Sequence, residues 1–273
     1  MKSAEDIVSL YIQRKKDRAS LINRMDEARR HYNGEIVVPL PELDDIEKPA
    51  IANLIAQGID QFSMRIASVM PDVSFPALRP GFQVSEDKAY ERRMATLGWI
   101  DMNKMPMKMR RRARFMTAYG CSPVSISPVA LDPNDHRQIP FWRPRNPLAT
   151  YPAPTYDPDS IEPENCIFVD RRPLSWLREH YPQQALALHT GKASSDTLFE
   201  ILEYVDAEET VLVAMGAAKT QNGYEPAAGG SMQTILERIP NRAGICPVVL
   251  PGRVTLDRLS GQFDQLFGMY QRQ

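Results

Sequence analysis

Proline is the residue that most restricts how this chain can fold. The 273 residues include 23 prolines, which concentrate between Pro123 and Pro182. Proline fixes the backbone φ angle and lacks the amide hydrogen that helix interiors and central strands require. Globular chains usually contain only about 5% proline. The sequence therefore predicts extended segments and turns between Pro123 and Pro182.

The chain before Pro123 predicts three helical regions. Ser3 and Asp6 fit a capping box at the start of a first helix over about Ala4–Tyr32, and Asn33-Gly34 supplies a left-handed stop. Two arginines interrupt its apolar positions, Arg14 and Arg18. An interrupted apolar stripe is typical of a helix that lies on a surface rather than in a core.

The second helix has Pro49 in its first turn and ends at Pro71. One continuous apolar face defines it: Ile51, Leu54, Ile55, Ile59, Phe62, Ile66 and Val69. Residues 72–84 predict a short strand and a loop. A third helical region starts near Ser85, and Pro106 should break it into one helix to about Lys104 and another over Met107–Tyr119. Gly120 should end the latter with a positive φ, where a β-branched residue would cost about 1 kcal/mol or more.

The rest of the chain predicts strands. Short strands are expected at residues 124–126, 139–143, 166–171, 232–239 and 245–250. Turns are expected at Asp132–Asp135 and Gly229-Gly230, and Ser175 should cap a short helix through Tyr181. The clearest hairpin covers residues 198–215, around Asp206–Glu209. From Leu256 the apolar spacing is helical again and continues to Gln273. Together these elements predict an α+β fold, with long helices packed on a small, mostly antiparallel sheet region.

Composition excludes several classes of protein. Lys and Arg number 33 against 34 Asp and Glu, giving a net charge of −1, so the chain is not a basic protein that grips DNA over most of its surface. The three cysteines (Cys121, Cys166 and Cys246) suggest neither a disulfide framework nor a metal motif. The amino-terminal residues are charged throughout and do not form a signal peptide. No apolar run approaches the length of about 20 residues that is needed to span a bilayer. We therefore expect synthesis in the host cytoplasm and no membrane partner.

Motifs for catalysis are also absent from the sequence. Gly191-Lys192 resembles a phosphate-binding loop only superficially, because Leu186 and Ala193 replace the first glycine and the magnesium-binding hydroxyl of that motif. The four histidines have no partner at ligand or triad spacing: His31, His136, His180 and His189. We therefore expect no enzymatic activity, no cofactor and no bound metal.

One basic cluster stands out, formed by Lys108, Arg110, Arg111, Arg112 and Arg114. At 100° per residue its charges wrap around the helix instead of forming one stripe. This favours pairing with carboxylates, across a subunit boundary, over a contact with nucleic acid, which remains the alternative. Exchanging Arg110 and Arg114 for Glu should then impair assembly.

The order of short segments along the chain resembles that of tailed-bacteriophage portal proteins, of the kind found in siphophages of actinobacteria. No single segment is diagnostic, and the ordered set carries the resemblance. The segments are Ala28–Gly34, Pro49–Gln61, Trp99 with Asn103, Ala118–Gly120, Val124–Ile126, Arg143–Leu148, Cys166–Arg172, Trp176–Pro182, Glu200–Val205 and Ile245–Leu250.

The resemblance implies a structural subunit of the virion. Such proteins form a ring of about a dozen subunits at one capsid vertex, with heterologous contacts. The ring is the head-to-tail connector through which double-stranded DNA is packaged and ejected. It contacts the major capsid and scaffold proteins, docks the packaging terminase, and later binds neck or adaptor proteins.

The resemblance also implies a domain division. Residues 1–250 would match the portal wing, and residues 251–273 would begin a helix leading towards the stem, clip and crown. On this match we expect the 273-residue chain alone to be monomeric or weakly associated, and a longer chain to form stable rings. Two other functions stay open at this point: a phage scaffold or adaptor that binds proteins without forming a ring, and an enzyme of unrecognised type.

Overall fold

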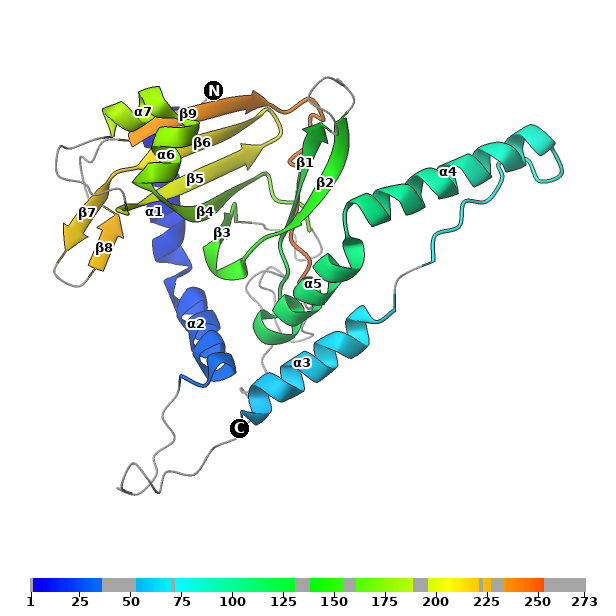
Figure 1. Cartoon of the computed structure of the whole chain (residues 1–273), viewed down its shortest axis with the longest axis horizontal. Helices are drawn as coiled ribbons and strands as arrows, with labels where there is room; N and C mark the ends of the chain where they lie inside the picture. The colour runs from blue at the N-terminus through cyan, green and yellow to red at the C-terminus, as the bar shows by residue number, and fades with distance from the viewer. Residues whose placement is uncertain are drawn as a thin grey trace.

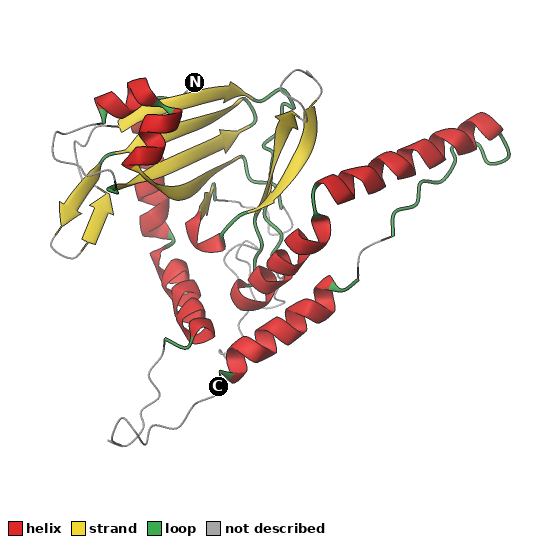
Figure 2. Ribbon diagram, in the orientation of Figure 1, coloured by secondary structure: helices red, strands yellow, loops and turns green. Residues whose placement is uncertain are grey.

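The computed structural model describes residues 2–35, 53–69, 72–130, 138–154, 161–188, 196–220, 223–226 and 233–252. The larger sheet and the helices that cover it lie at one end, and a long helical arm, α4 (Gln83–Met102) in Figure 1, projects from the other. Figure 2 shows the same arrangement coloured by element type. All described strand pairs are antiparallel, which confirms the predicted α+β class.

The larger sheet has five strands. Their order is β3 (Thr150–Pro152), β4 (Asn165–Pro173), β5 (Leu198–Asp206), β6 (Glu209–Met215) and β9 (Gln233–Pro240). β5 and β6 are the hairpin predicted over residues 198–215, and the strands predicted at 166–171 and 232–239 are also confirmed as β4 and β9.

Both faces of the larger sheet are covered by helices. These are α1 (Ala4–Asp17), α6 (Leu174–His180) and α7 (Pro182–Ala187). Successive strand residues point to opposite faces. Leu202 and Tyr204 of β5 therefore pack with the side chains of α1, whereas Phe199 and Ile201 pack with α6 and α7. The predicted short helix is confirmed as α6, but Ser175 does not cap it, because the helix already begins at Leu174.

The smaller sheet has three strands, in the order β10 (Val248–Val249), β1 (Val124–Ala130) and β2 (Gln138–Pro144). A separate antiparallel pair is formed by β7 (Ala217–Thr220) and β8 (Gly223–Pro226). The strand predicted over residues 245–250 is too long, since only two residues pair there. Pro247 and Pro251 flank this pair and lack amide hydrogens for a ladder.

The first predicted helix is two helices in the structure. α1 stops before Arg18, which has φ −98° and ψ 4°, and α2 covers Ala19–Asn33. The predicted capping box is present, with the Asp6 amide donating to Ser3 Oγ over 3.1 Å. Gly34 ends α2 at φ 72°, which confirms the predicted left-handed stop.

Arg14 corrects the prediction that the first helix lies on a surface. Its side chain is buried on the same face of α1 as Ile7 and Tyr11. Nη1 donates to the Tyr151 carbonyl over 3.0 Å, and Nη2 donates to Asn165 Oδ1 over 2.5 Å. An arginine stem packs like an apolar chain when its guanidinium finds acceptors. Arg14 therefore belongs to the buried stripe and joins α1 to the edge of the sheet.

The remaining helices are α3 (Leu54–Ala67), α4 (Gln83–Met102) and α5 (Met105–Tyr119). α3 lies along α5, whereas α4 extends away from the body as an arm (Figure 1). The predicted break is confirmed, with Pro106 in the first turn of α5. The strand predicted within residues 72–84 is wrong: residues 72–82 form no strand, since Pro76 and Pro80 remove two amide donors, and residues 83–84 already belong to α4.

The apolar face predicted for the second helix is only partly covered. α5 packs on the side of α3 that carries Ile59, Ser63 and Ala67, and these three residues are buried. Phe62 and Ile66 remain exposed. Other predicted features lie outside the described residues: Pro49, Pro71, Asp132–Asp135, Gly191-Lys192, Gly229-Gly230 and the helix from Leu256 to Gln273.

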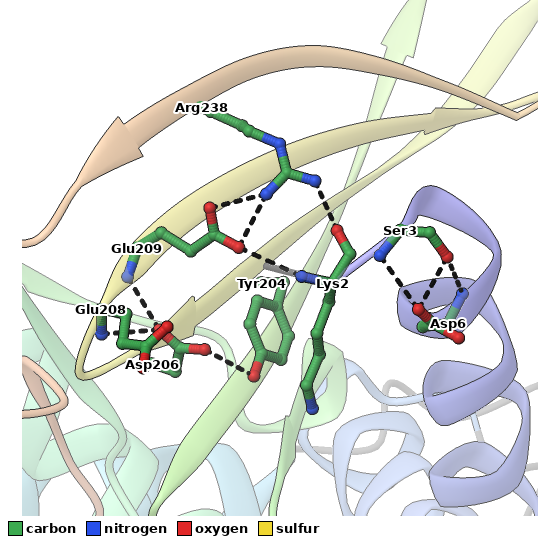
Figure 3. A network of polar contacts seen from close by, with 8 residues as sticks. All are labelled: Lys2, Ser3, Asp6, Tyr204, Asp206, Glu208, Glu209 and Arg238. Carbon is green, nitrogen blue, oxygen red and sulfur yellow. Dashed lines mark hydrogen bonds and ion pairs between the residues drawn. The ribbon is translucent and has the colours of Figure 1, made fainter.

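A polar network closes the turn between β5 and β6 (Figure 3). Asp206 Oδ1 accepts hydrogen bonds from the Glu208 and Glu209 amides, each over 2.8 Å, and Oδ2 accepts from the Tyr204 hydroxyl over 2.8 Å. Burial opposes ionisation of Asp206, but the three hydrogen bonds outweigh it and hold the pKa below its ordinary value.

The same network binds the start of the chain (Figure 3). Arg238 Nη1 donates to both carboxylate oxygens of Glu209, over 2.7 and 2.6 Å, and Nη2 donates to the Lys2 carbonyl. The Lys2 ammonium lies 5.0 Å from the centre of the Tyr204 ring. These contacts fix the amino-terminal end of α1 against β5, β6 and β9.

Replacing Asp206 with Asn tests the charge at this turn. Because the pKa of Asp206 is lower in the folded protein, its carboxylate stabilises the fold fully above the unfolded-state pKa of about 3.9. This stabilisation is lost as the pH falls through the pKa of the folded state. We expect Asp206→Asn to lower the free energy of unfolding by about 1–2 kcal/mol at pH 7. Urea unfolding at several pH values should show this difference shrinking below about pH 4. The exposed Asp101→Asn is the control, and a pH-independent difference for Asp206→Asn would contradict the argument.

Replacing Gly120 tests the helix stop at the end of α5. Its φ is 76°, as predicted, a conformation that costs an L-residue about 1–2 kcal/mol. Gly120→Ala should destabilise the protein by about that amount. Gly98 lies within α4 with open space around it, so the same change there should stabilise by about 0.5–1 kcal/mol. Thermal denaturation of both variants checks the opposite signs.

Candidate functional site

The junction between α4 and α5 is built on one buried amide, that of Asn103. Asn103 has 0% exposure, and its Nδ2 donates to the carbonyls of Trp99 and Pro140, over 3.1 and 3.3 Å. Its Oδ1 accepts from the Trp142 amide over 2.8 Å and from the Lys108 ammonium over 3.1 Å. The side chain therefore ties together α4, α5 and β2.

The backbone at this junction interrupts the helical path. Lys104 follows Asn103 and has a φ of 50°. Among the described residues other than glycine, it alone has a positive φ. Left-handed backbone is uncommon outside glycine and persists where the surroundings hold it. The Trp99 indole donates to the Pro140 carbonyl over 2.6 Å, which fixes the last turn of α4 on β2. The direction of the α4 arm is thereby set at its base.

A shallow groove of about 460 Å³ lies beside this junction, between α5 and β2. Its lining is cationic, aromatic and apolar: Met107, Lys108, Arg111, Phe141, Trp142, Arg143, Pro144 and Arg145. Two of its arginines, Arg111 and Arg143, are exposed. The lining contains no carboxylate, so the groove offers positive charge next to aromatic surface.

Aromatic rings, rather than carboxylates, contact most of these cations. The Lys108 ammonium lies 3.6 Å from the centre of the Phe141 ring, and the Arg112 guanidinium lies 5.3 Å from the Trp142 ring. Arg111 lies 5.3 Å from Phe115. Burial, with a smaller contribution from nearby Arg143, lowers the pKa of Lys108. Cation–π contacts leave a positive charge uncompensated, so a negative partner would gain from binding here.

The five residues of the predicted basic cluster have different surroundings. Arg114 pairs with Asp60 over 2.8 Å, and Tyr32 donates to the same carboxylate over 2.9 Å, which ties α2, α3 and α5. Within the described ranges, none of Lys108, Arg110, Arg111 and Arg112 forms an ion pair. The expected pairing with carboxylates is thus met inside the chain by Arg114, and for the other four it stays a prediction about a neighbouring subunit.

Sequence reasoning missed the contribution of β2 to this site. Phe141 and Arg143 are alternate residues of β2, and strand geometry places alternate residues on one face. That pattern marks a strand with a cationic surface, but only the pairing of β1 with β2 brings it beside α5. Asn103 was noted as a family feature, yet nothing in the sequence shows that its amide is buried.

The side chains of the groove are suited to binding a negatively charged partner. They offer cationic donors and aromatic faces, but no carboxylate or histidine that could serve as a general base. No group of three or more potential metal ligands occurs among the residues that the structure describes. In the same part of the chain, no helix is both long and apolar enough to cross a membrane.

Comparison with known proteins gives no family assignment. No protein-family model matches this chain, and no curated protein matches it.

Removing the Asn103 amide tests its role at the junction. Asn103→Ala leaves the Trp142 amide without its acceptor in a buried setting, so the free energy of unfolding should fall by about 1–3 kcal/mol. Asn23→Ala, at an exposed position of α2, should change it by less than about 0.5 kcal/mol. Chemical denaturation of both variants checks this, and equal small effects would show that the junction does not depend on the amide.

Proposed function

We propose that the chain is a structural subunit of a phage portal, the head-to-tail connector ring at one capsid vertex. The observation that carries this proposal is the α4 arm. α4 has 20 residues, and none of them is buried. A helix of this kind requires a surface to pack on, which the described part of the protein's own body does not supply.

The apolar side chains of the arm argue for a protein partner. Tyr90, Met94 and Leu97 are 63%, 49% and 36% exposed. Further exposed apolar residues precede α4, namely Phe75, Leu78 and Phe82. Isolated helices are only marginally stable in water. Large contiguous apolar surfaces on a folded protein mark interaction sites. A subunit that is completed by its neighbours accounts for both features.

The segment order that resembles portal proteins supports the same conclusion independently of the arm. A near-neutral chain also fits a ring whose channel lets DNA slide instead of holding it tightly. On this proposal the described α+β body is part of the portal wing. Its partners are further copies of the chain, major capsid and scaffold proteins, the packaging terminase, and neck or adaptor proteins.

Electron microscopy tests the proposal directly. The purified chain, cross-linked at high concentration so that weak contacts are captured, should give closed rings of one size with a central hole. A phage scaffold or adaptor would bind other proteins without closing into such a ring. Open filaments, or no oligomer at all even after cross-linking at high concentration, would contradict the proposal.

Two matched variants connect this experiment to the arm. Met94→Lys introduces a charge on the exposed apolar side of α4, and Ala95→Lys introduces the same charge about 100° away around the helix. We expect Met94→Lys to abolish the rings and Ala95→Lys to retain them, while circular dichroism shows both to be folded. Equal ring formation by the two variants would remove α4 from the subunit contact.

A further inference from the structure

The α4 arm segregates its charges and apolar groups around the helix. At 100° per residue, one arc of about 100° contains most of its acidic side chains and the exposed apolar side chains at its centre, while exposed Val84 and Met102 lie outside the arc. This face, called the acidic face below, consists of Glu86, Asp87, Tyr90, Met94, Leu97 and Asp101. Lys88 and Arg92 lie on the opposite side, as does Trp99, whose indole is bound to the body of the protein. The acidic face therefore points away from the surface that anchors the arm.

Its carboxylates are available to a partner. Glu86 accepts a hydrogen bond from the Gly81 amide over 3.1 Å, and Asp87 accepts one from Gln83 over 2.9 Å. Among the described residues, neither these two nor Asp101 forms an ion pair. The apolar centre between them, Tyr90 to Leu97, is likewise uncovered.

The groove between α5 and β2 has the complementary character. It combines the exposed cations Arg111 and Arg143 with apolar surface from Met107, which is 69% exposed, and Phe141. Acidic ends and an apolar centre on α4 thus correspond to cations and an apolar centre in the groove. Complementary potentials of this kind fix partner and register at protein interfaces.

We propose that the acidic face of α4 in one subunit docks in the α5/β2 groove of the next copy of the chain. The proposal rests on the proposed function for taking a second copy as the partner. The two surfaces are different, so the contact is heterologous and propagates from subunit to subunit instead of ending at a dimer. Arg111 and Arg143 receive the carboxylates of α4, while Met107 and Phe141 cover Tyr90 and Met94.

Disulfide trapping between two chains that each carry one added cysteine tests the contact. We expect a mixture of Asp87→Cys and Arg143→Cys chains to form a disulfide-linked pair, and neither chain alone to do so. The full chain carrying both cysteines should give a ladder of dimers, trimers and larger species. The parent is the control, because Cys121 and Cys166 are buried and Cys246 is partly buried. Efficient cross-linking of Asp87→Cys chains alone would show α4 against α4, and would overturn the proposal.

Charge reversal supplies the second measurement. Arg111→Glu with Arg143→Glu should weaken self-association at least about tenfold in sedimentation, and adding Glu86→Arg and Asp87→Arg to the same chain should restore most of it. Lys16→Glu with Arg178→Glu, two exposed positions away from the groove, should leave association unchanged. If reversal in the groove spares self-association and removes binding to double-stranded DNA, the groove is a nucleic-acid site and the proposal is wrong.

The outcomes for the contact and for the portal function are separable. Rings that still form when Arg111 and Arg143 are reversed would leave the portal function standing and overturn the docking of α4. A cross-linked ladder without closed rings would support the docking and contradict the portal function.

Discussion

The placement of every outward surface depends on how one buried side chain, Asn103, interrupts a helix. The amide uses both of its hydrogens and its oxygen, so that the end of α4, the start of α5 and the middle of β2 share one anchor. A buried polar group that is fully bonded specifies geometry more sharply than apolar packing, because each bond has a direction. Lys104 accepts left-handed backbone only because these bonds hold both sides of it.

The arm and the groove follow from this junction. The helix on one side of Asn103 leaves the body, and the helix on the other side runs back along α3, so the outward face of α4 and the surface of α5 diverge (Figure 1). The arm consequently exposes apolar side chains that its own body cannot reach. At the opposite end of the molecule, Arg14 and the Asp206 network instead bind α1 tightly to the sheet. The body is closed by its own contacts, whereas the arm is left for another molecule.

Local signals in the sequence predicted much of this fold, because they act over a few residues. Gly34 and Gly120 stop helices by their own backbone freedom, Ser3 caps by bonding three residues ahead, and the β-rich runs around Asp206 need only a turn between them. Some errors are local, such as the strands that prolines prevent, but the error at Arg14 concerns partners distant in sequence. Arg14 looked like a surface residue because its acceptors, Tyr151 and Asn165, are more than a hundred residues away. The basic cluster was visible, but its aromatic contacts from β2 were not, since they depend on tertiary pairing.

Net charge conceals the feature that matters for assembly. A value of −1 for the chain suggests weak electrostatics, yet most carboxylates of α4 lie on one side of the arm, and Arg111 and Arg143 of the groove at its base form no ion pair within the described residues. Two opposite surfaces on one rigid subunit attract between copies and leave little net repulsion in the assembled state. In the proposed assembly, the two surfaces differ, so each added copy presents the same free pair again, and growth stops only when the last arm meets the first groove. The direction that the Asn103 contacts give to α4 would then decide whether the ring closes, and the same amide holds Lys108 and Trp142 of the groove, so a change at Asn103 would act on both docking surfaces.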